Sequence, residues 1–90
     1  MLKLRGLPFT ATKDDIISFF DDVGAAPLVH DSIHCVEQNG RFNGTAFAEF
    51  ASEGDAKLAL RKDRSRMGGR YIELFASSRE EATRQAMNGR

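Results

Sequence analysis

The dipeptide Asn39-Gly40, followed by a strand-like alternation, constrains the fold of this chain more than any other feature. Both residue types tolerate the positive φ angles of a tight two-residue turn, so the pair predicts a β-hairpin. From residue 45 to residue 50 the side chains alternate, and one face carries Ala46, Ala48 and Phe50. Because two of these residues are small, we expect a helix to pack closely there. The ring of Phe47 is expected on the opposite, outward face.

Three segments have the pattern of helices. The first begins at an N-cap, Thr12, and stops at Gly24. Its apolar stripe consists of Ile16, Phe19, Phe20 and Val23. The second begins after Ser52, and its inner stripe consists of Ala56, Ala59 and Leu60. The third opens with a capping-box pattern over residues 78–81 and is expected to reach about Met87, with few apolar residues to pack.

Three further segments are predicted as strands: residues 2–4, 32–37 and 71–75. In the second of them either the odd-numbered residues, Ile33 and Cys35, or the even-numbered ones could face the core. Residues 61–69 are expected to form a basic connection. The order strand, helix, strand, strand, helix, strand, helix predicts an α+β, ferredoxin-like βαββαβ fold. This is a four-stranded antiparallel sheet with two helices on one face, plus a C-terminal helix. We expect one domain over residues 1–77 and a helical extension over residues 78–90.

The composition is that of an ordinary globular chain, and no catalytic or metal-binding pattern stands out. Of the 90 residues, 41% are hydrophobic and 29% are charged, which suits a single domain. The single cysteine, Cys35, excludes an internal disulfide, and the nearby His30 and His34 lack zinc-site spacing. No base held by a third group is identifiable for a cysteine nucleophile. The N-terminus is charged too early for a signal peptide or membrane span. We expect a monomeric domain without catalytic residues, metal, cofactor or membrane partner.

The net charge is zero, but the charges are unevenly distributed. Residues 61–70 carry five basic residues and one acid, whereas residues 14–31 carry five acids and no lysine or arginine. A neutral chain has no global basic field to attract a nucleic acid. Any nucleic-acid recognition must therefore come from local groups.

The two central strand segments resemble the two conserved motifs of an RNA-recognition motif (RRM). Residues 43–50 occupy the family's octameric motif and residues 2–7 its hexameric one. An RRM of the usual kind stacks bases on aromatic rings of the sheet. Here Thr45 and Lys3 stand where two of those rings are expected, and of the three only Phe47 remains.

These departures match a subgroup of the family. Residues 4–9 (LRGLPF), the segment with Gly40-Arg41 and residues 44–47 (GTAF), and residues 63–73 (DRSRMGGRYIE) resemble the quasi-RRMs. Such domains occur in the heterogeneous nuclear ribonucleoprotein F/H family and in epithelial splicing regulators. The resemblance covers residues 2–80, with three separate motifs in the right order.

The resemblance implies recognition of guanine runs in single-stranded RNA through loops rather than through the sheet. Carried over position by position, the RNA-binding residues would be Arg5, Phe9, Arg41, Arg64, Arg70 and Tyr71. Secondary RNA contacts would be Lys3, Phe47 and Arg66. The family often has tryptophan at the position of Phe9. The resemblance further implies a module of a splicing or RNA-processing factor, in the nucleus and also in the cytoplasm, with other RNA-processing proteins as partners.

The chemistry of these residue types agrees with that implication. Guanine presents O6 and N7 as adjacent acceptors, which an arginine fork meets with two hydrogen bonds. Guanidinium planes and aromatic rings can also sandwich unstacked bases. Structural alternatives remain open: Phe9 could staple the first helix, Tyr71 could be a half-buried strand aromatic, and Phe47 could lie under the final helix or a loop.

Two other functions compete with RNA binding. The missing sheet aromatics and the zero net charge would also fit a protein-interaction module that has lost RNA binding. Arginines in all three motif segments argue against this alternative. An enzyme of the acylphosphatase type shares the strand order, but residues 5–8 (RGLP) offer no nest of free N–H groups for a phosphate.

Overall fold

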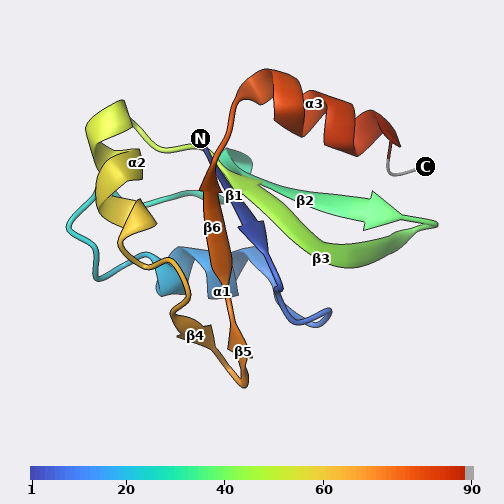
Figure 1. The fold of residues 1–90 in the computed structure, drawn as a ribbon, viewed down its shortest axis with the longest axis horizontal. Coiled ribbons are helices and arrows are strands. Elements are labelled where there is room, and N and C mark those ends of the chain that lie inside the picture. The colour runs from blue at the N-terminus through green and yellow to red at the C-terminus, as the bar shows by residue number, and fades with distance from the viewer. Residues whose placement is uncertain (89–90) are drawn as a thin grey trace.

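The computed structural model describes the backbone of residues 1–88, and all their side chains except those of residues 79 and 85–88. In chain order the elements are β1 (Leu2–Arg5), α1 (Lys13–Phe19), the 3-10 turn η1 (His30–Ser32), β2 (Ile33–Gln38), β3 (Arg41–Ala48), α2 (Glu53–Leu60), β4 (Arg66–Met67), β5 (Arg70–Tyr71), β6 (Glu73–Ala76) and α3 (Arg79–Asn88). Figure 1 labels the helices and the strands.

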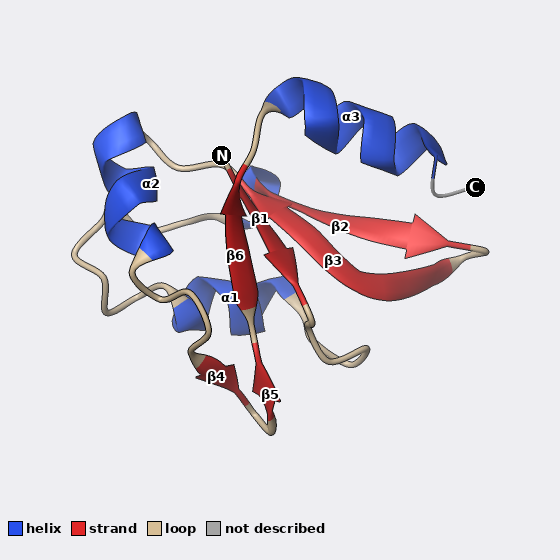
Figure 2. Cartoon of the chain, viewed as in Figure 1, coloured by secondary structure: helices blue, strands red, loops and turns tan. Residues whose placement is uncertain are grey.

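Four strands form one antiparallel sheet in the order β2-β3-β1-β6, while β4 and β5 form a separate small hairpin (Figure 2). Leu4 of β1 lies between Ala46 of β3 and Leu74 of β6, and all three are buried. Helices α1 and α2 contribute their apolar residues to the same core. Asn39 and Gly40 both have positive φ, 54° and 78°, as the predicted hairpin turn requires. The predicted ferredoxin-like α+β fold is confirmed.

Helix α1 begins as the sequence predicts and ends earlier. Thr12 and Asp15 form a capping box, in which the Thr12 hydroxyl accepts the Asp15 N–H (3.2 Å) and the Asp15 carboxylate accepts the Thr12 N–H (2.9 Å). The helix ends at Phe19, and the segment that was expected to continue to Val23 forms tighter turns instead. Asp21 and Asp22 follow the C-cap residue Phe20, and negative charge at the C-terminal end opposes the helix dipole.

Helix α2 packs through alanines, and one expected core residue is exposed. The Ser52 hydroxyl caps the helix by accepting the Asp55 N–H (3.1 Å). Ala56 and Ala59 are buried, but Leu60 is 37% exposed, so its predicted place in the inner stripe is wrong. One step along a helix turns about 100°, which carries Leu60 away from the buried side at Ala59.

Residues 61–69, expected to form a basic connection, contain the first strand of a hairpin. The strand expected over residues 71–75 is divided between β5 and β6. Strands β4 and β5 pair across a turn at Gly68 and Gly69. The Ile72 N–H donates to the Ser65 carbonyl (2.9 Å), and the Arg64 N–H donates to the Ile72 carbonyl (2.7 Å). Because both backbone groups of Ile72 bond to residues 64 and 65, just before β4, pairing with β1 starts only at Glu73.

The second face of the sheet carries α3 over its β2 side. Phe47 and Val36 are buried but stand apart from the core shared with α1 and α2. Strand register places Phe47 on the same face as Lys3, whose Nζ lies 3.2 Å from Glu81 of α3. The Ser77 hydroxyl donates to the other oxygen of Glu81 (2.7 Å). We call the three side chains Lys3, Glu81 and Ser77 the α3 clamp. It holds the start of α3 against the sheet, and α3 contacts β2 (Figure 1).

The structure decides two questions that the sequence left open. Ile33 and Cys35 face the helical core, so the odd-numbered residues of β2 point inward. Phe47 is fully buried, as the alternative of a ring under the final helix requires. The secondary RNA contact expected at Phe47 is therefore not accessible, because no surface of the ring reaches solvent. Lys3, the neighbouring secondary contact, is held in the α3 clamp.

The α3 clamp gives a pH-dependent prediction. Hydrogen bonds from Ser77 and then Lys3 lower the pKa of Glu81 below its ordinary 4.5. A carboxylate with a lowered folded pKa stabilises the fold above pH 4.5, and this contribution is lost as pH falls through the folded pKa. Glu81→Gln should thus loosen α3 at pH 7 by at most about 1 kcal/mol, since the pair is partly exposed. Amide hydrogen exchange in β2 measures this.

The matched control is Glu80→Gln, which removes the same charge from the neighbouring, exposed position. It should leave exchange in β2 unchanged at every pH. The difference between wild type and Glu81→Gln should disappear in strong acid. Equal effects of the two variants, or a difference that persists after Glu81 is protonated, would contradict the role given to the clamp.

Candidate nucleic-acid interface

Three aromatic rings are exposed on the part of the chain that the structure describes. They are Phe9, 68% exposed, Tyr71, 62% exposed, and Phe75, 41% exposed. Large rings on a small domain normally contribute to the core. The other large exposed apolar residues described are the aliphatic Val29 and Leu60. Exposed aromatic surface on this domain therefore lies at three positions.

Each of these rings has an arginine over it. The distances from the guanidinium carbon to the ring centroid are 5.8 Å for Arg70 over Phe9, 5.1 Å for Arg66 over Tyr71 and 5.9 Å for Arg5 over Phe75. We call these the ring–guanidinium pairs. Cation–π attraction of this kind is worth about 0.5–1 kcal/mol at an exposed site, and it favours keeping the arginine close to the ring. A flat, electron-rich ligand can add to such a stack.

Two glycines allow the loop that carries Phe9 to approach its neighbours. Gly6 has φ +83°, and a Cβ there would lie 3.1 Å from the Tyr71 carbonyl oxygen. Gly44 has φ +87°, and its Cβ would lie 3.0 Å from the Leu7 carbonyl oxygen and 3.4 Å from the Phe9 ring. The Leu7 N–H donates to the Gly44 carbonyl (3.0 Å). The loop is thereby fixed between β3 on one side and β5 on the other.

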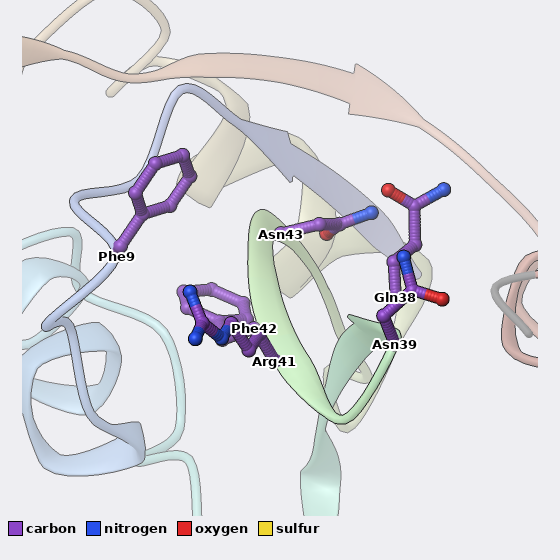
Figure 3. Close-up of a pocket in the computed structure, with 6 residues that line it drawn as sticks. All are labelled: Phe9, Gln38, Asn39, Arg41, Phe42 and Asn43. Carbon is purple, nitrogen blue, oxygen red and sulfur yellow. The ribbon is translucent and has the colours of Figure 1, made fainter.

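An open cavity of about 920 Å³ lies between Phe9 and the β2–β3 hairpin. It is lined by Phe9, Gln38, Asn39, Arg41, Phe42 and Asn43. In Figure 3 the ring of Phe9 stands on its loop across from Arg41 and Phe42 of the hairpin. The Asn43 carboxamide oxygen accepts the Thr45 N–H (3.0 Å), which leaves its NH₂ side as the donor toward a ligand. This is a concave site with an aromatic wall, a cationic wall and amide donors.

The RRM domain family matches residues 2–89 of the chain. The second quasi-RRM (qRRM2) of Glorund, a solved structure, is 40% identical, with a TM-score of 0.84 over 93% of this chain and 94% of that one. This chain belongs to the RRM family, and within it to the quasi-RRMs. Its recognition from residues 4–9, 40–47 and 63–73 is confirmed.

Other relatives point to the same group. Heterogeneous nuclear ribonucleoprotein F of Bos taurus is 45% identical over 85 residues, which is 90% of this chain and 20% of that protein. Heterogeneous nuclear ribonucleoprotein H2 of Homo sapiens is 44% identical over 80 residues, 89% of this chain and 17% of that protein. The solved human G-rich RNA sequence binding factor 1 is 31% identical, with a TM-score of 0.78 over 97% of this chain and 90% of that one. The quasi-RRM spans about a fifth of the curated relatives it matches.

The quasi-RRM brings most of the predicted site residues together in two groups. Phe9, Arg70 and Arg41 form one group, since Arg70 lies over the Phe9 ring and Arg41 shares its cavity. Tyr71 forms another with Arg66, which the sequence suggested only as a secondary contact. Phe9 and Tyr71 are too exposed for the structural alternatives of a helix staple or a half-buried strand aromatic.

Two predicted residues lie elsewhere. Arg5 lies over Phe75 on the sheet, not beside Phe9. Arg64 is exposed, with φ +65°, and its N–H donates to the Ile72 carbonyl, so its observed contact is made by the backbone. RNA contact by each of these residues stays a prediction.

Sequence reasoning did not select Phe75 or the amides of the cavity as site residues. The outward position of Phe75 is visible in the alternation of residues 71–75, but its arginine partner depends on the pairing of β1 with β6. The amides Gln38, Asn39 and Asn43 flank the hairpin turn, where their residue types are explained by turn chemistry alone. Only the approach of Phe9 reveals them as the wall of a cavity.

The described residues contain no group of three or more His, Cys, Asp or Glu side chains placed to hold a metal ion. The Nε2 atom of His30 lies 2.6 Å from the carboxylate of Asp14, and both side chains are exposed. Burial raises the pKa of the Cys35 thiol, which lowers its thiolate fraction. Within residues 1–88 there is also no helix of the length and apolar character that crossing a membrane requires.

The contact at Gly44 can be tested by substitution. Gly44→Ala should destabilise the quasi-RRM more than Gly40→Ala, by about 1–3 kcal/mol, measured by urea unfolding. Both positions have positive φ and cost similar backbone strain, but at Gly40 a Cβ meets nothing within 4 Å. The difference between the variants isolates the clash with the Leu7 carbonyl. Equal losses would show that the loop yields and is not fixed there.

Proposed function

We propose that this quasi-RRM binds single-stranded RNA containing runs of guanine, through its loops rather than the centre of its sheet. The observation that carries the proposal is the set of ring–guanidinium pairs. Bases stacked on exposed rings gain about 1–3 kcal/mol each. An arginine beside the ring adds two hydrogen bonds to O6 and N7 of a guanine, which the other bases cannot accept in the same way.

The cavity at Phe9 supplies the first binding position in this proposal. A guanine enters between the Phe9 ring and the hairpin, with Arg70 on the ring and Arg41 on the opposite wall. Tyr71 with Arg66 supplies the next position along the same end of the domain. The burial of Phe47 supports this arrangement, because the ring an ordinary RRM would use for stacking is covered.

The names of the relatives support the biological setting. One is a G-rich RNA sequence binding factor, and others are heterogeneous nuclear ribonucleoproteins. We infer a module of a splicing or RNA-processing factor that acts in the nucleus, and also in the cytoplasm, beside other RNA-processing proteins. In this proposal residues 1–77 form the binding module and residues 78–90 a helical extension. Helix α3 (Arg79–Asn88) of this extension covers part of the sheet, and residues 89–90 lie outside the described residues. The mechanism is equilibrium binding without chemical change of the RNA.

Replacement of Arg70 tests the cavity directly. Arg70→Ala should weaken binding to a short RNA with three consecutive guanines by about 1–3 kcal/mol, a factor of about 5 to 150. The thermal midpoint should hardly change, since both Arg70 and Phe9 are exposed. Fluorescence anisotropy of the labelled RNA measures the affinity, with adenines replacing the guanines as the reference.

Arg61→Ala is the matched control, because Arg61 is exposed in the same basic segment and ends α2 rather than facing a ring. It should leave guanine selectivity intact. If Arg61→Ala weakens binding as much as Arg70→Ala, general backbone attraction replaces the cavity as the explanation. If the folded domain does not prefer guanine over adenine at physiological salt, the proposal fails and the protein-interaction module becomes the favoured alternative.

The salt dependence of binding gives a separate test. Zero net charge and a recognition mode built on bases predict that few phosphates are neutralised. The slope of log K against log salt concentration should be about −2 or shallower, at roughly −0.7 per neutralised phosphate. A slope steeper than about −4 would indicate that phosphate contacts dominate.

A further inference from the structure

We propose that the uncovered half of the sheet holds one more guanine, stacked on Phe75 beside the neighbouring side chains of Arg5 and Glu73. This inference rests on the proposed function, because it extends the path of the same RNA. It assigns an RNA-binding role to the sheet, at a strand other than those that carry the usual stacking rings. Phe75 and Glu73 are its new site residues.

The cover provided by α3 ends before this part of the sheet. The sheet order places β2 and β6 at opposite edges, and α3 contacts the β2 side (Figure 1). Lys3 lies between the two halves, paired with Phe47 on one side and with Phe75 on the other. Phe47 is fully buried and Phe75 is 41% exposed. The α3 clamp therefore marks a boundary, beyond which the sheet face is open to a ligand.

The open half carries one ring and two charges of opposite sign. Strand register pairs Arg5 directly with Glu73, so both side chains stand on the same face as Phe75. Both are exposed, and the Arg5 guanidinium lies over the Phe75 ring. The ion pairs among the described side chains are those of Lys3, His30 and Lys62 with acids elsewhere, so Arg5 and Glu73 do not pair with each other. An exposed ring thus has a guanidinium donor and a carboxylate acceptor beside it. We call this combination the Phe75 frame.

This frame matches guanine better than other bases. The Watson–Crick edge of guanine has two adjacent donors, N1–H and N2–H, and a carboxylate can accept both at once. The adjoining Hoogsteen edge has the acceptors O6 and N7, which an arginine can meet. Adenine has no such pair of adjacent donors. A guanine stacked on Phe75 could therefore meet Glu73 with one edge and Arg5 with the other.

The position is continuous with the loop site. Tyr71, Glu73 and Phe75 are alternate residues of one extended segment, so they follow one another along the same side of the chain. At about 3.3 Å per residue, Phe75 lies no more than about 13 Å from Tyr71 along that segment. RNA that leaves the Tyr71–Arg66 pair can thus pass over Glu73 to Phe75.

The test compares a short RNA with three guanines against RNAs extended by two guanines on the 5′ or the 3′ side. For the wild-type domain one extended RNA should bind about tenfold more tightly than the short one. Phe75→Ala should remove most of that gain and leave affinity for the short RNA within about twofold. Phe75→Leu, which keeps apolar surface at the position, should lose the same gain and exclude a folding defect.

Glu73→Gln should reduce the preference for guanine over adenine in the added nucleotides, since an amide cannot accept both donors. Val29→Ala is the control, because Val29 is an exposed apolar residue that belongs to none of the ring–guanidinium pairs. If the affinity gained from the extension persists in Phe75→Ala, the inference is overturned and the loop site still stands. The same holds if Val29→Ala loses that gain equally. Failure of the wild-type domain to bind the short guanine run would overturn the proposed function as well.

Discussion

The candidate site depends on two close approaches of backbone, one at Gly6 and one at Gly44. At both positions a side chain would come within about 3.1 Å of a carbonyl oxygen, of Tyr71 in one case and of Leu7 in the other. Each position also has a positive φ, so glycine is favoured there both by the close approach and by the backbone conformation. These contacts fix the loop after β1 between the hairpin that carries Arg41 and the strand that carries Tyr71. Side chains from three distant parts of the sequence thereby share one end of the domain.

The placement of exposed rings is the reverse of that in an ordinary RRM. In an ordinary RRM the central strands present rings to RNA and the loops adjust around them. Here the central ring, Phe47, is buried, and Lys3 beside it is held by Glu81. The exposed rings stand instead at the loop end and on the edge strand β6, each with its own arginine. Base recognition then needs neither a basic surface nor an open central sheet, which is consistent with a neutral net charge.

Local signals in the sequence predicted much of the fold. Asn39-Gly40 gave the hairpin, Thr12 with Asp15 gave the start of α1, and the Ser78 hydroxyl caps α3 by accepting the Glu81 N–H (3.2 Å), as its position predicted. These features depend on neighbours within three or four residues. The β4–β5 hairpin was not predicted, because the strand pattern of residues 71–75 hides the bonds that divert Ile72 toward Ser65.

The candidate site was predictable in its residue types and not in its pairings. The arginines and rings of the three motif segments include most of the candidate site residues. Which arginine lies over which ring, however, follows from loop packing and strand register. Arg5 shows this most clearly. Its sequence neighbours place it at the first loop, while the pairing of β1 with β6 places its guanidinium over Phe75. Long-range register of this kind is set by the whole sheet and leaves no local pattern.

The measurement that tests this account most directly is an NMR titration of the domain, with ¹³C-labelled aromatic side chains, by a guanine-run RNA. Seven phenylalanines and one tyrosine make the ring signals few enough to assign. The account predicts that the signals of Phe9, Tyr71 and Phe75 shift during the titration, while that of Phe47 stays unchanged. A shift of the Phe47 signal, with α3 released from the sheet, would show that RNA binds the central sheet after all and would contradict the account.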